Sequence, residues 1–509
     1  MKKSQQIKEE ADKRLKIFEK FVDILVFKYG YRHNFFLTDF YSVGIATKEL
    51  YFKAPEIKRS WQKHLENKNN DKHFAQLYIG TPYCASKCSY CMYFKEIGAP
   101  KRIEEYKNNL IASINYFSDV LKNITFDNIY FGGGTPSLFS EKQLQEICHV
   151  LKNKIHFKTT GERTCECNPS SATLEKLKTL KKAGFNRVSF GVQSLNKKVL
   201  KDINRDYQNF SMVKESILGA KKAGIKYINV DLMLGLYNDT PLSFIDAFKK
   251  IISLKPYALR VYSVQPIKSY LDKYFQGKLS NFEKHFEKQK KVMDKLCAIA
   301  AEMNFSYEKK GLKFNKRSSS AIDFRNKDIS PLTAVYLPYY IEDKEASLFC
   351  LGHAGNSYIH NQIRYRSEPL SKNPNENTYV GIKTDRRNEM TYFLLNNLSN
   401  NKSLSLKSFK KVFNTELKDE FDYEIKLLKS LKQIEFKKDE MIFLPVKAKE
   451  RFTYSMFFIP YDQLLKNMRN LLNGKGKTLP IKKRTMQIQG YLNTVICKSS
   501  ITGEKLTLK

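Results

Sequence analysis

Three cysteines stand close together in one short stretch of the chain. Cys84, Cys88 and Cys91 form the pattern C-x3-C-x2-C within the run YCASKCSYC. Thiolates are soft ligands that hold iron–sulfur clusters, and a compact loop with this spacing can hold three corners of a cubane cluster. The fourth iron is then open to a small molecule. The spacing therefore predicts a [4Fe-4S] cluster, with these three cysteines as its metal ligands.

Zinc is the structural alternative at this loop. A closed zinc site needs four ligands, yet no Cys or His follows closely on the C-terminal side, and His73 precedes the predicted strand. The other six of the nine cysteines are scattered, and we expect them to be small buried residues. An odd number of cysteines in a chain without a secretion signal argues against a disulfide framework.

The loop follows the first of several short apolar runs that alternate with helical stretches. The predicted strands are 75–79, 128–131, 164–168, 187–190, 227–232 and 258–264, and the predicted helices are 103–122, 141–154, 172–183, 210–223 and 242–253. This alternation predicts an α/β fold with a parallel sheet, and about six units suit a partial (β/α)6 barrel of the TIM type. Ligands of such sheets bind at the carboxyl ends of the strands.

The flanking regions do not show this alternation of strands and helices. An amphipathic helix is predicted at 5–29, and a small helical region with a hairpin near Lys437–Glu440 is predicted towards the C-terminus. The predicted units are an N-terminal helical segment 1–72, a core 73–310, an irregular connection 311–387 with a glycine-rich turn at 350–357, a small α+β domain 388–472 and a basic tail 473–509.

The chain is strongly basic, with 89 Lys and Arg against 52 Asp and Glu and a formal charge of +37. The lysines are spread over nearly every segment, which is typical of a codon bias and predicts solvated side chains. An acidic substrate or partner is one alternative. Nucleic acid is another, but it favours a concentrated patch, and only Lys475–Arg484 is compact. No apolar run reaches about 18 residues, so we expect a soluble, cytoplasmic protein without membrane contact or nucleic-acid binding.

Further motifs resemble the radical S-adenosylmethionine (SAM) superfamily, and within it the oxygen-independent coproporphyrinogen III oxidase-like family, which includes haem chaperones and C-methylases. The matching stretches follow the family's order over about residues 75 to 265. They are LYIGTPYC at 77–84, YFGGGTP at 130–136, ECNP at 166–169, GFNRVSFGVQS at 184–194, NR at 204–205 and NVDLMLGL at 229–236. The turn at 350–357 resembles a later motif more weakly.

The resemblance implies that a reduced [4Fe-4S] cluster passes one electron to SAM, and that a 5′-deoxyadenosyl radical then abstracts hydrogen from the substrate. It implies one or two bound SAM molecules, a small-molecule substrate such as a tetrapyrrole, and a reductant such as flavodoxin or ferredoxin. The implied cofactor-binding residues are Tyr78, Tyr90, Gly133, Gly134, Thr135, Glu166, Gln193, Arg205 and Asp231. Taken singly, such residues are also typical of core packing, tight turns and surface charges.

Four positions depart from the family pattern. Gly80 stands where decarboxylating members usually carry His, Tyr93 stands where a fourth Cys is common, and Gln265 and Asn356 replace small and apolar residues. The radical core is intact, but the substrate is left open. The hypotheses are coproporphyrinogen oxidase-like decarboxylation of a tetrapyrrole, C-methyl transfer with two SAM molecules, a haem chaperone-like carrier, and tRNA modification.

Overall fold

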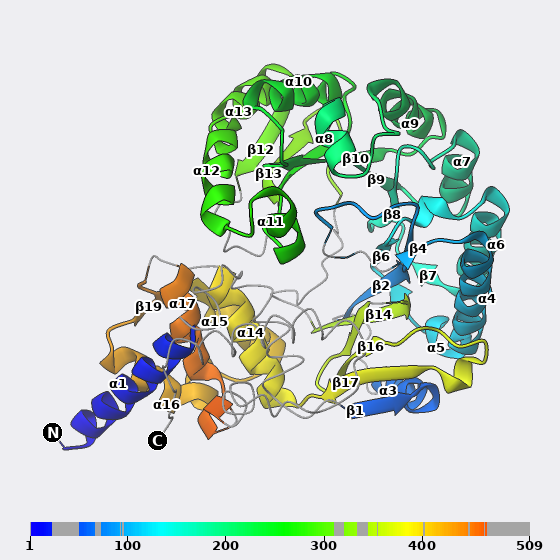
Figure 1. Cartoon of the computed structure of the whole chain (residues 1–509). Helices are drawn as coiled ribbons and strands as arrows, with labels where there is room; N and C mark the ends of the chain where they lie inside the picture. Colours follow the sequence, from blue (N-terminus) through cyan, green and yellow to red (C-terminus); the bar gives the residue numbers. More distant parts are fainter. Residues whose placement is uncertain are drawn as a thin grey trace.

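A computed structural model describes most of the chain, and one large sheet organises it (Figure 1). The described residues are 2–22, 50–66, 73–91, 93, 96–309, 320–332, 345–353, 355–400, 403–445, 448–462 and 464–465. The sheet has 13 strands in the order β1-β17-β16-β15-β14-β2-β6-β8-β9-β10-β11-β13-β12, so β1 and β12 form its two edges. Within the described residues, no helix is both long and apolar enough to cross a membrane.

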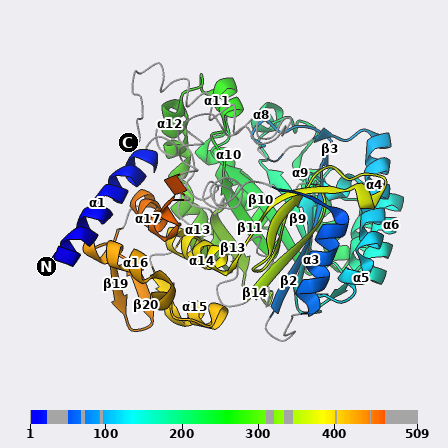
Figure 2. The same ribbon diagram turned by 90° about the horizontal axis from the view of Figure 1, so that it is seen from below.

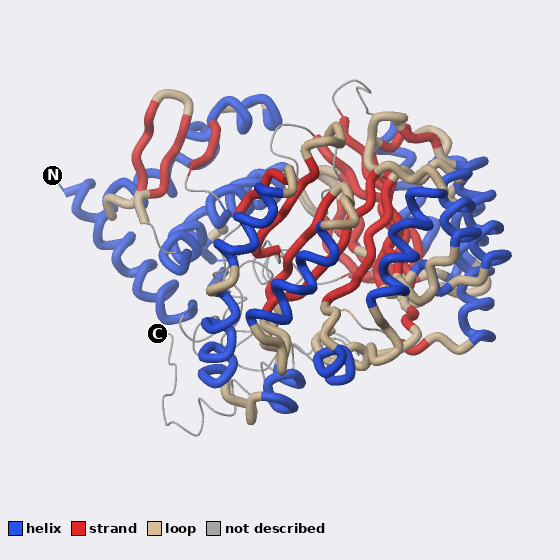
Figure 3. The backbone as a smooth tube through the Cα atoms, turned by 90° about the horizontal axis from the view of Figure 1, so that it is seen from above, coloured by secondary structure: helices blue, strands red, loops and turns tan. Residues whose placement is uncertain are grey.

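Six neighbouring strands of this sheet are parallel, and they are the six strands that the sequence predicts. They are β2 (His73–Thr81), β6 (Asn128–Gly133), β8 (Arg163–Cys167), β9 (Arg187–Gln193), β10 (Tyr227–Leu234) and β11 (Ala258–Ser263). The sheet curves without closing, with helices along its outer side (Figures 1 and 3). The predicted α/β class and partial barrel are confirmed.

The helices on the outer side also match the prediction, with shifts at their ends. They are α4 (Pro100–Tyr116), α6 (Glu141–Lys154), α7 (Leu174–Lys182), α9 (Phe210–Lys222) and α10 (Pro241–Ile252). Ser140 and Gln143 form a capping box that fixes the start of α6. Thr240 and Ser243 do the same for α10, and Pro241 occupies its first turn. These caps fix the residues at which the loops before α6 and α10 end.

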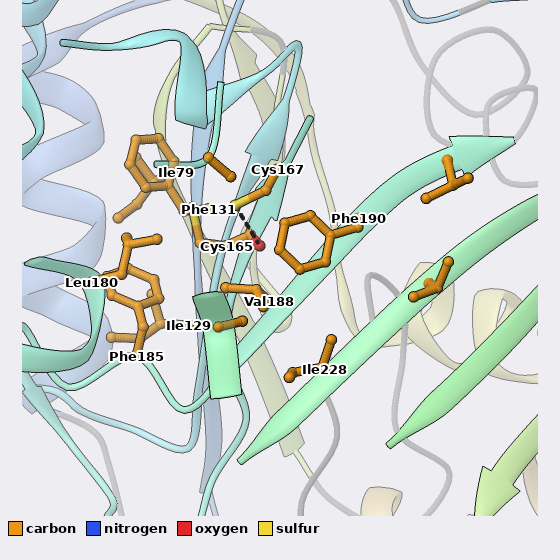
Figure 4. Close-up of a cluster of buried hydrophobic side chains, with 14 of the residues drawn as sticks. Ile79, Ile129, Phe131, Cys165, Cys167, Leu180, Phe185, Val188, Phe190 and Ile228 are labelled. Atoms are coloured by element: carbon orange, nitrogen blue, oxygen red, sulfur yellow. Dashed lines mark hydrogen bonds between the residues drawn. The ribbon is translucent and has the colours of Figure 1, made fainter. Parts of the chain in front are cut away.

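The outward-facing side chains of the strands form the main core with these helices (Figure 4). Phe131, Cys165, Val188 and Phe190 pack there beside Leu180. The Cys167 thiol donates to the Cys165 carbonyl, with 3.8 Å between sulfur and oxygen, and neither cysteine is in a disulfide. Both are thus small buried residues, as expected. Because side chains alternate along a strand, the residues between them face the interior of the barrel.

The connection 311–387 is not irregular where the structure describes it, so that prediction is wrong. It contains β13 (Ser320–Asn326), β14 (Glu345–Gly352), β15 (Asn356–Ile359), β16 (Ile363–Ser367) and β17 (Thr378–Lys383). β14 pairs with β2 in parallel, which makes it a seventh parallel strand. Its apolar run is short and does not alternate, and its partner is about 270 residues away in the sequence, so local periodicity could not identify it.

A second core lies in the C-terminal part of the chain. α1 (Lys2–Val22) packs there against α16 (Leu417–Ser430) and α17 (Ala448–Ser455), and the Phe18 and Phe457 rings are 5.0 Å apart (Figure 2). α14 (Arg386–Asn400) and α15 (Leu406–Phe413) belong to the same core. The predicted hairpin is confirmed as β19 (Ile434–Lys437) and β20 (Glu440–Phe443), with β18 (Ser403–Ser405) beside it.

The predicted N-terminal segment 1–72 is divided between the two cores. β1 (Leu50–Lys53) pairs with β17, and Trp61 of α3 (Ala54–Glu66) packs 4.7 Å from Phe349 of β14, whereas α1 joins the second core. The predicted domain boundaries remain predictions, because residues of the segment 1–72 contribute to both cores. The rest of the predicted helix beyond residue 22, the polar run at 67–71 and the basic tail lie outside the described residues.

The remaining elements are short or flank the barrel. The strands are β3 (Tyr83–Cys84), β4 (Glu96–Ile97), β5 (Thr125–Phe126), β7 (His156–Phe157) and β12 (Phe305–Lys309). The helices are α5 (Ser118–Leu121), α8 (Lys197–Asp202), α11 (Lys268–Tyr274), α12 (Leu279–Lys290), α13 (Met293–Glu302) and the 3-10 turns η3 (Pro136–Leu138), η4 (Pro374–Glu376) and η5 (Met456–Phe458).

A buried ion pair stabilises the amino end of the barrel and gives a test of the fold. The Arg187 guanidinium donates to Glu162 Oε1 at 2.5 Å, both side chains are at most 4% exposed, and the Thr164 hydroxyl donates to the same oxygen. We expect Glu162→Ala to lower the free energy of unfolding by about 3–5 kcal/mol, because the guanidinium stays buried without its counter-ion. Chemical denaturation measures this loss.

The matched control is Glu175→Ala, which breaks the exposed pair between Glu175 and Lys178. An exposed pair contributes about 0–1 kcal/mol, so this variant should unfold nearly like the parent. Equal losses in the two variants would contradict the interpretation of Glu162 and Arg187 as a buried pair.

Candidate functional site

The cysteine loop begins at the carboxyl end of β2, the edge at which the fold predicts ligands. β3 carries Cys84, and the Gly98 N–H donates to the Cys84 carbonyl at 3.0 Å. The Cys91 N–H donates to the Cys88 carbonyl at 3.1 Å, which closes a tight turn between the last two cysteines. All three thiols are half-buried and free of disulfides. The loop is therefore compact and still accessible to a ligand.

The donor set of the loop consists of three free, half-buried thiols. Among the described residues, no group of three His, Cys, Asp or Glu side chains that could hold a single metal ion is found. Thiolates on a compact loop are the ligands that hold iron–sulfur clusters, so the chemistry of this donor set fits such a cluster.

Two donors from neighbouring elements face the thiols. Arg205 donates from Nε to Cys88 Sγ at 3.2 Å and from a terminal nitrogen to the Gly191 carbonyl. The Thr135 hydroxyl donates to Cys84 Sγ at 3.5 Å. Burial raises the pKa of the Cys84 thiol, and the Thr135 hydrogen bond partly offsets that rise. The Thr135 hydrogen bond favours the Cys84 sulfur in its thiolate form, which is the form that binds iron.

The glycine-rich turn after β6 lies directly against the cysteine strand. Gly133 has a φ of +105°, and a Cβ on it would lie 2.7 Å from the Thr81 carbonyl oxygen. The Thr135 N–H donates to the Tyr83 carbonyl at 2.8 Å, and a side chain on Gly134 would collide with that carbonyl. Glycine is required at both positions, because nothing larger permits this close approach of two backbones.

Glu166 is the second-last residue of β8 and lies beside this turn. Its Oε1 accepts from the Tyr130 hydroxyl at 2.7 Å and its Oε2 accepts from the Gly133 N–H at 3.1 Å. Burial raises the pKa of its carboxyl to about 7, and these two hydrogen bonds oppose the rise. The Tyr78 ring stacks on that of Tyr130, with centroids 6.0 Å apart. The structure thus brings Tyr78, Gly133 and Glu166 together, as the sequence predicts.

A second group of predicted residues lies on β9 and β10. Asp231 accepts from the Ser189 hydroxyl at 2.9 Å and from the Asn229 amide at 2.7 Å, and burial raises the pKa of its carboxyl. Gln193 ends β9 at a φ of +70°, and its buried Oε1 has no hydrogen-bond donor. A buried acceptor without a donor is costly, so this amide is available to a ligand.

Tyr90 also lies beside the thiols. Burial raises the pKa of its hydroxyl, and the Arg205 charge opposes that rise. The predicted site residues thus lie on β2, β8, β9 and β10, at the end of β6 and on the turn after it, on the cysteine loop and, for Arg205, after α8 beside Cys88.

The comparison with protein families decides what kind of domain this is. Residues 78–251 match the model of the radical SAM superfamily. Residues 78–251 are therefore a radical SAM domain. Members of this superfamily use a [4Fe-4S] cluster and SAM, so the radical SAM domain accounts for the thiol loop and the glycine turn together.

Several curated proteins are similar to part of this chain. An oxygen-independent coproporphyrinogen III oxidase of Helicobacter pylori strain J99 is 34% identical over 229 residues, which is 44% of this chain and 49% of that protein. The Heme chaperone HemW of Haemophilus influenzae is 34% identical over 185 residues, 35% of this chain and 48% of that protein. The chain thus spans about half the length of these relatives.

A solved structure is similar over a larger part of the chain. The coproporphyrinogen III oxidase HemN of Escherichia coli, described as a radical SAM enzyme, aligns with a TM-score of 0.61 and 18% identity. The alignment covers 79% of this chain and 93% of that one. At this identity the likeness shows the fold alone. Because it covers 79% of the chain, it extends well beyond residues 78–251.

The contacts around Gly80 at this edge could not be predicted from the sequence. Gly80 faces the turn after β14, and a side chain there would collide with the His353 carbonyl. The Tyr106 hydroxyl donates to the Gly80 carbonyl and accepts from the His353 N–H. The radical SAM domain therefore has no room at position 80 for the His expected of decarboxylating relatives. Only the pairing of β14 with β2 reveals this contact.

A row of charged side chains inside the barrel was not predicted from the sequence either. Arg260 on β11 is the register partner of Asp231 on one side and of Asp323 on the other. Its Nε lies 3.8 Å from Asp323 Oδ1. The predicted strand 258–264 contains Arg260, so strand alternation could have placed it inside, but its neighbour Asp323 lies in the region predicted to be irregular.

The raised pKa of Glu166 predicts a pH dependence of stability in the SAM-free protein. The folded state holds this proton up to about pH 7, whereas the unfolded carboxyl loses it near pH 4.5. The folded state therefore binds more protons in that window, and the free energy of unfolding should fall as the pH rises from about 4.5 to 7. Denaturant titrations at several pH values measure the slope.

Glu166→Gln isolates the contribution of this carboxyl. Because Gln does not titrate, the slope of stability against pH between 4.5 and 7 should become flatter than in the parent. An unchanged slope would show that the Glu166 carboxyl titrates at its ordinary value.

Proposed function

We propose that this chain is a radical SAM enzyme that binds a [4Fe-4S] cluster through Cys84, Cys88 and Cys91 and acts on a tetrapyrrole-like small molecule. The observation that carries the proposal is the meeting of the thiol loop with the glycine turn: the Thr135 hydroxyl lies 3.5 Å from Cys84 Sγ, and the Thr135 N–H bonds to the Tyr83 carbonyl. When bound, the cluster supplies the electron that cleaves SAM to methionine and a 5′-deoxyadenosyl radical.

The chain's own residues would hold SAM beside the thiols. Gly133 and Gly134 let the turn lie against the Thr81 and Tyr83 backbone, which would place a methionine moiety bound at this turn beside Cys84. Glu166, held by Tyr130 and the Gly133 N–H, offers carboxylate oxygens to ribose hydroxyls or an amino group. Tyr78 and Tyr90 would exclude water from the space between cluster and nucleotide.

A second group supports binding of a second SAM molecule. Gln193 has a buried amide oxygen without a donor, Asp231 is held by Ser189 and Asn229, and Arg205 lies over Gly191. These residues lie on β9, on β10 and after α8, apart from the glycine turn. Two SAM molecules would fit C-methyl transfer, which is the second candidate function. Equilibrium dialysis against SAM gives the number bound, and mass spectrometry of the product shows whether a methyl group was added.

The choice of substrate rests on the relatives. Curated proteins similar to this chain are named as coproporphyrinogen III oxidases and as Heme chaperones, and both names concern tetrapyrroles. Such substrates carry carboxylates, which suits a chain with a formal charge of +37. Because Gly80 leaves no room for a side chain, we propose a tetrapyrrole-like substrate without committing the chain to decarboxylation. Anaerobic incubation with coproporphyrinogen III, followed by mass spectrometry, tests the oxidase reaction.

A protein reductant such as flavodoxin or ferredoxin would supply the electron. The half-buried thiols and the exposed Ala85 and Lys87 leave the loop open to such a partner. Lys87 carries a charge opposite to that of an acidic electron carrier, which favours encounter.

The test of the proposed function is Cys88→Ala. Because thiolate ligation holds the cluster, the variant reconstituted without oxygen should lose nearly all of its iron and sulfide and form no 5′-deoxyadenosine with SAM and reductant. Its far-ultraviolet circular dichroism should match the parent, since Cys88 lies outside the hydrophobic cores.

Cys148→Ala is the matched control, because Cys148 is a buried cysteine of α6 in the main core. It should keep its iron and its SAM cleavage. A Cys88→Ala protein that retained the parent's colour and iron content would overturn the assignment of the cysteine loop as the cluster site.

A further inference from the structure

The cysteine loop is held from outside by the carboxyl end of α8. The Ser86 hydroxyl donates to the Asn204 carbonyl at 3.2 Å, and the Asn204 amide donates back to the Lys87 carbonyl at 2.7 Å. The Ser89 hydroxyl donates to the Asp202 carbonyl at 3.1 Å. Asn204 adopts a φ of +60°, as is common after the last turn of a helix. These bonds fix both sides of Cys88.

Tyr274 joins this arrangement from α11, outside the residues 78–251 that match the family model. Its hydroxyl donates to the Asp202 carbonyl and lies 3.2 Å from Ser89 Oγ. Its ring packs against the rings of Tyr237 and Tyr270, each with centroids 4.9 Å away. The hydroxyl is thus held in place between the helix end and the residue that separates Cys88 from Tyr90.

We propose that Tyr274 is a positioning residue for the iron–sulfur cluster, acting through Ser89 and Asp202 on the turn that carries Cys88 and Cys91. The inference rests on the proposed function, because it assigns a role towards the same cluster. A loop with three ligands must be ordered before it can bind, and ordering the backbone costs about 1–2 kcal/mol per residue. Partners of the ligand loop lower that cost and orient the ligands.

The Asp202 side chain adds a further anchor. Its carboxylate accepts from the Asn238 amide at 2.8 Å, and Asn238 follows β10 directly beside Tyr237. The Tyr237 N–H in turn donates to the Tyr270 hydroxyl at 2.8 Å. The cysteine loop is therefore connected to β10 and α11, two elements that belong to the barrel core. The orientation of its turn should depend on the Tyr274 hydroxyl.

The experiment compares Tyr274→Phe with the parent after anaerobic reconstitution of the full chain. The variant should bind iron, then lose it to a chelator about fivefold faster, the factor that corresponds to one net hydrogen bond of about 1 kcal/mol. The electron paramagnetic resonance spectrum of the reduced cluster should broaden, because the ligand turn samples more conformations. Ser89→Ala should behave alike, and the double variant should be no worse than either single one.

Tyr365→Phe is the control, because it removes a buried hydroxyl on β16 that accepts from the Trp61 indole N–H at 2.7 Å and takes no part in the bonds around the cysteine loop. It should lower the melting temperature yet keep the parent's iron-loss rate and spectrum. Iron loss and spectra in Tyr274→Phe equal to those of the parent would overturn the proposal while leaving the proposed function intact. A parent chain that binds no iron would overturn the proposed function, and this inference with it.

Discussion

The parallel register of the central strands is the constraint on which the site depends. Across β2 and β6, Gly80 pairs with Gly132 and Thr81 with Gly133, and Glu166 of β8 is the partner of Ser189 on β9. Because the strands run in one direction, their carboxyl ends meet at one edge. Thiols, glycines and carboxylates that lie far apart in the sequence are thereby brought within a few ångströms of each other.

The interior of the barrel contains hydrogen-bonded and charged side chains, whereas a core that only stabilises a fold is largely apolar. Tyr130 and Glu166 are hydrogen-bonded, Asp231 lies beside Ser189 and Asn229, and Arg260 stands between two aspartates. Burial raises the pKa of both Glu166 and Asp231. Carboxyls with perturbed pKa values that share a concave space are typical of functional sites. The outer side of the same strands is apolar and carries the stability of the fold.

Local sequence patterns were enough to predict the elements that have a periodicity or a motif of their own. The strand–helix alternation gave the six parallel strands, and the cysteine spacing with the glycine run gave the loop and the turn that meet in the structure. β14 was missed because its short apolar run has no alternation, and its pairing with β2 is set by tertiary contacts. Tyr274 and Asp323 were missed for the same reason, because each reaches the site from a segment without a motif. His353 lies in the glycine-rich turn 350–357, but only the fold reveals that it faces Gly80.

The pairing of β14 with β2 has a consequence during synthesis. The strand before the cysteines reaches one of its two neighbours only when residues 345–352 leave the ribosome, long after β6 has emerged. Until then one flank of β2 is an open edge, and such edges can pair with other chains. α1 likewise lacks its packing partners until α16 and α17 have been synthesised. The nascent chain therefore has to keep β2 and α1 unaggregated until β14, α16 and α17 have been made.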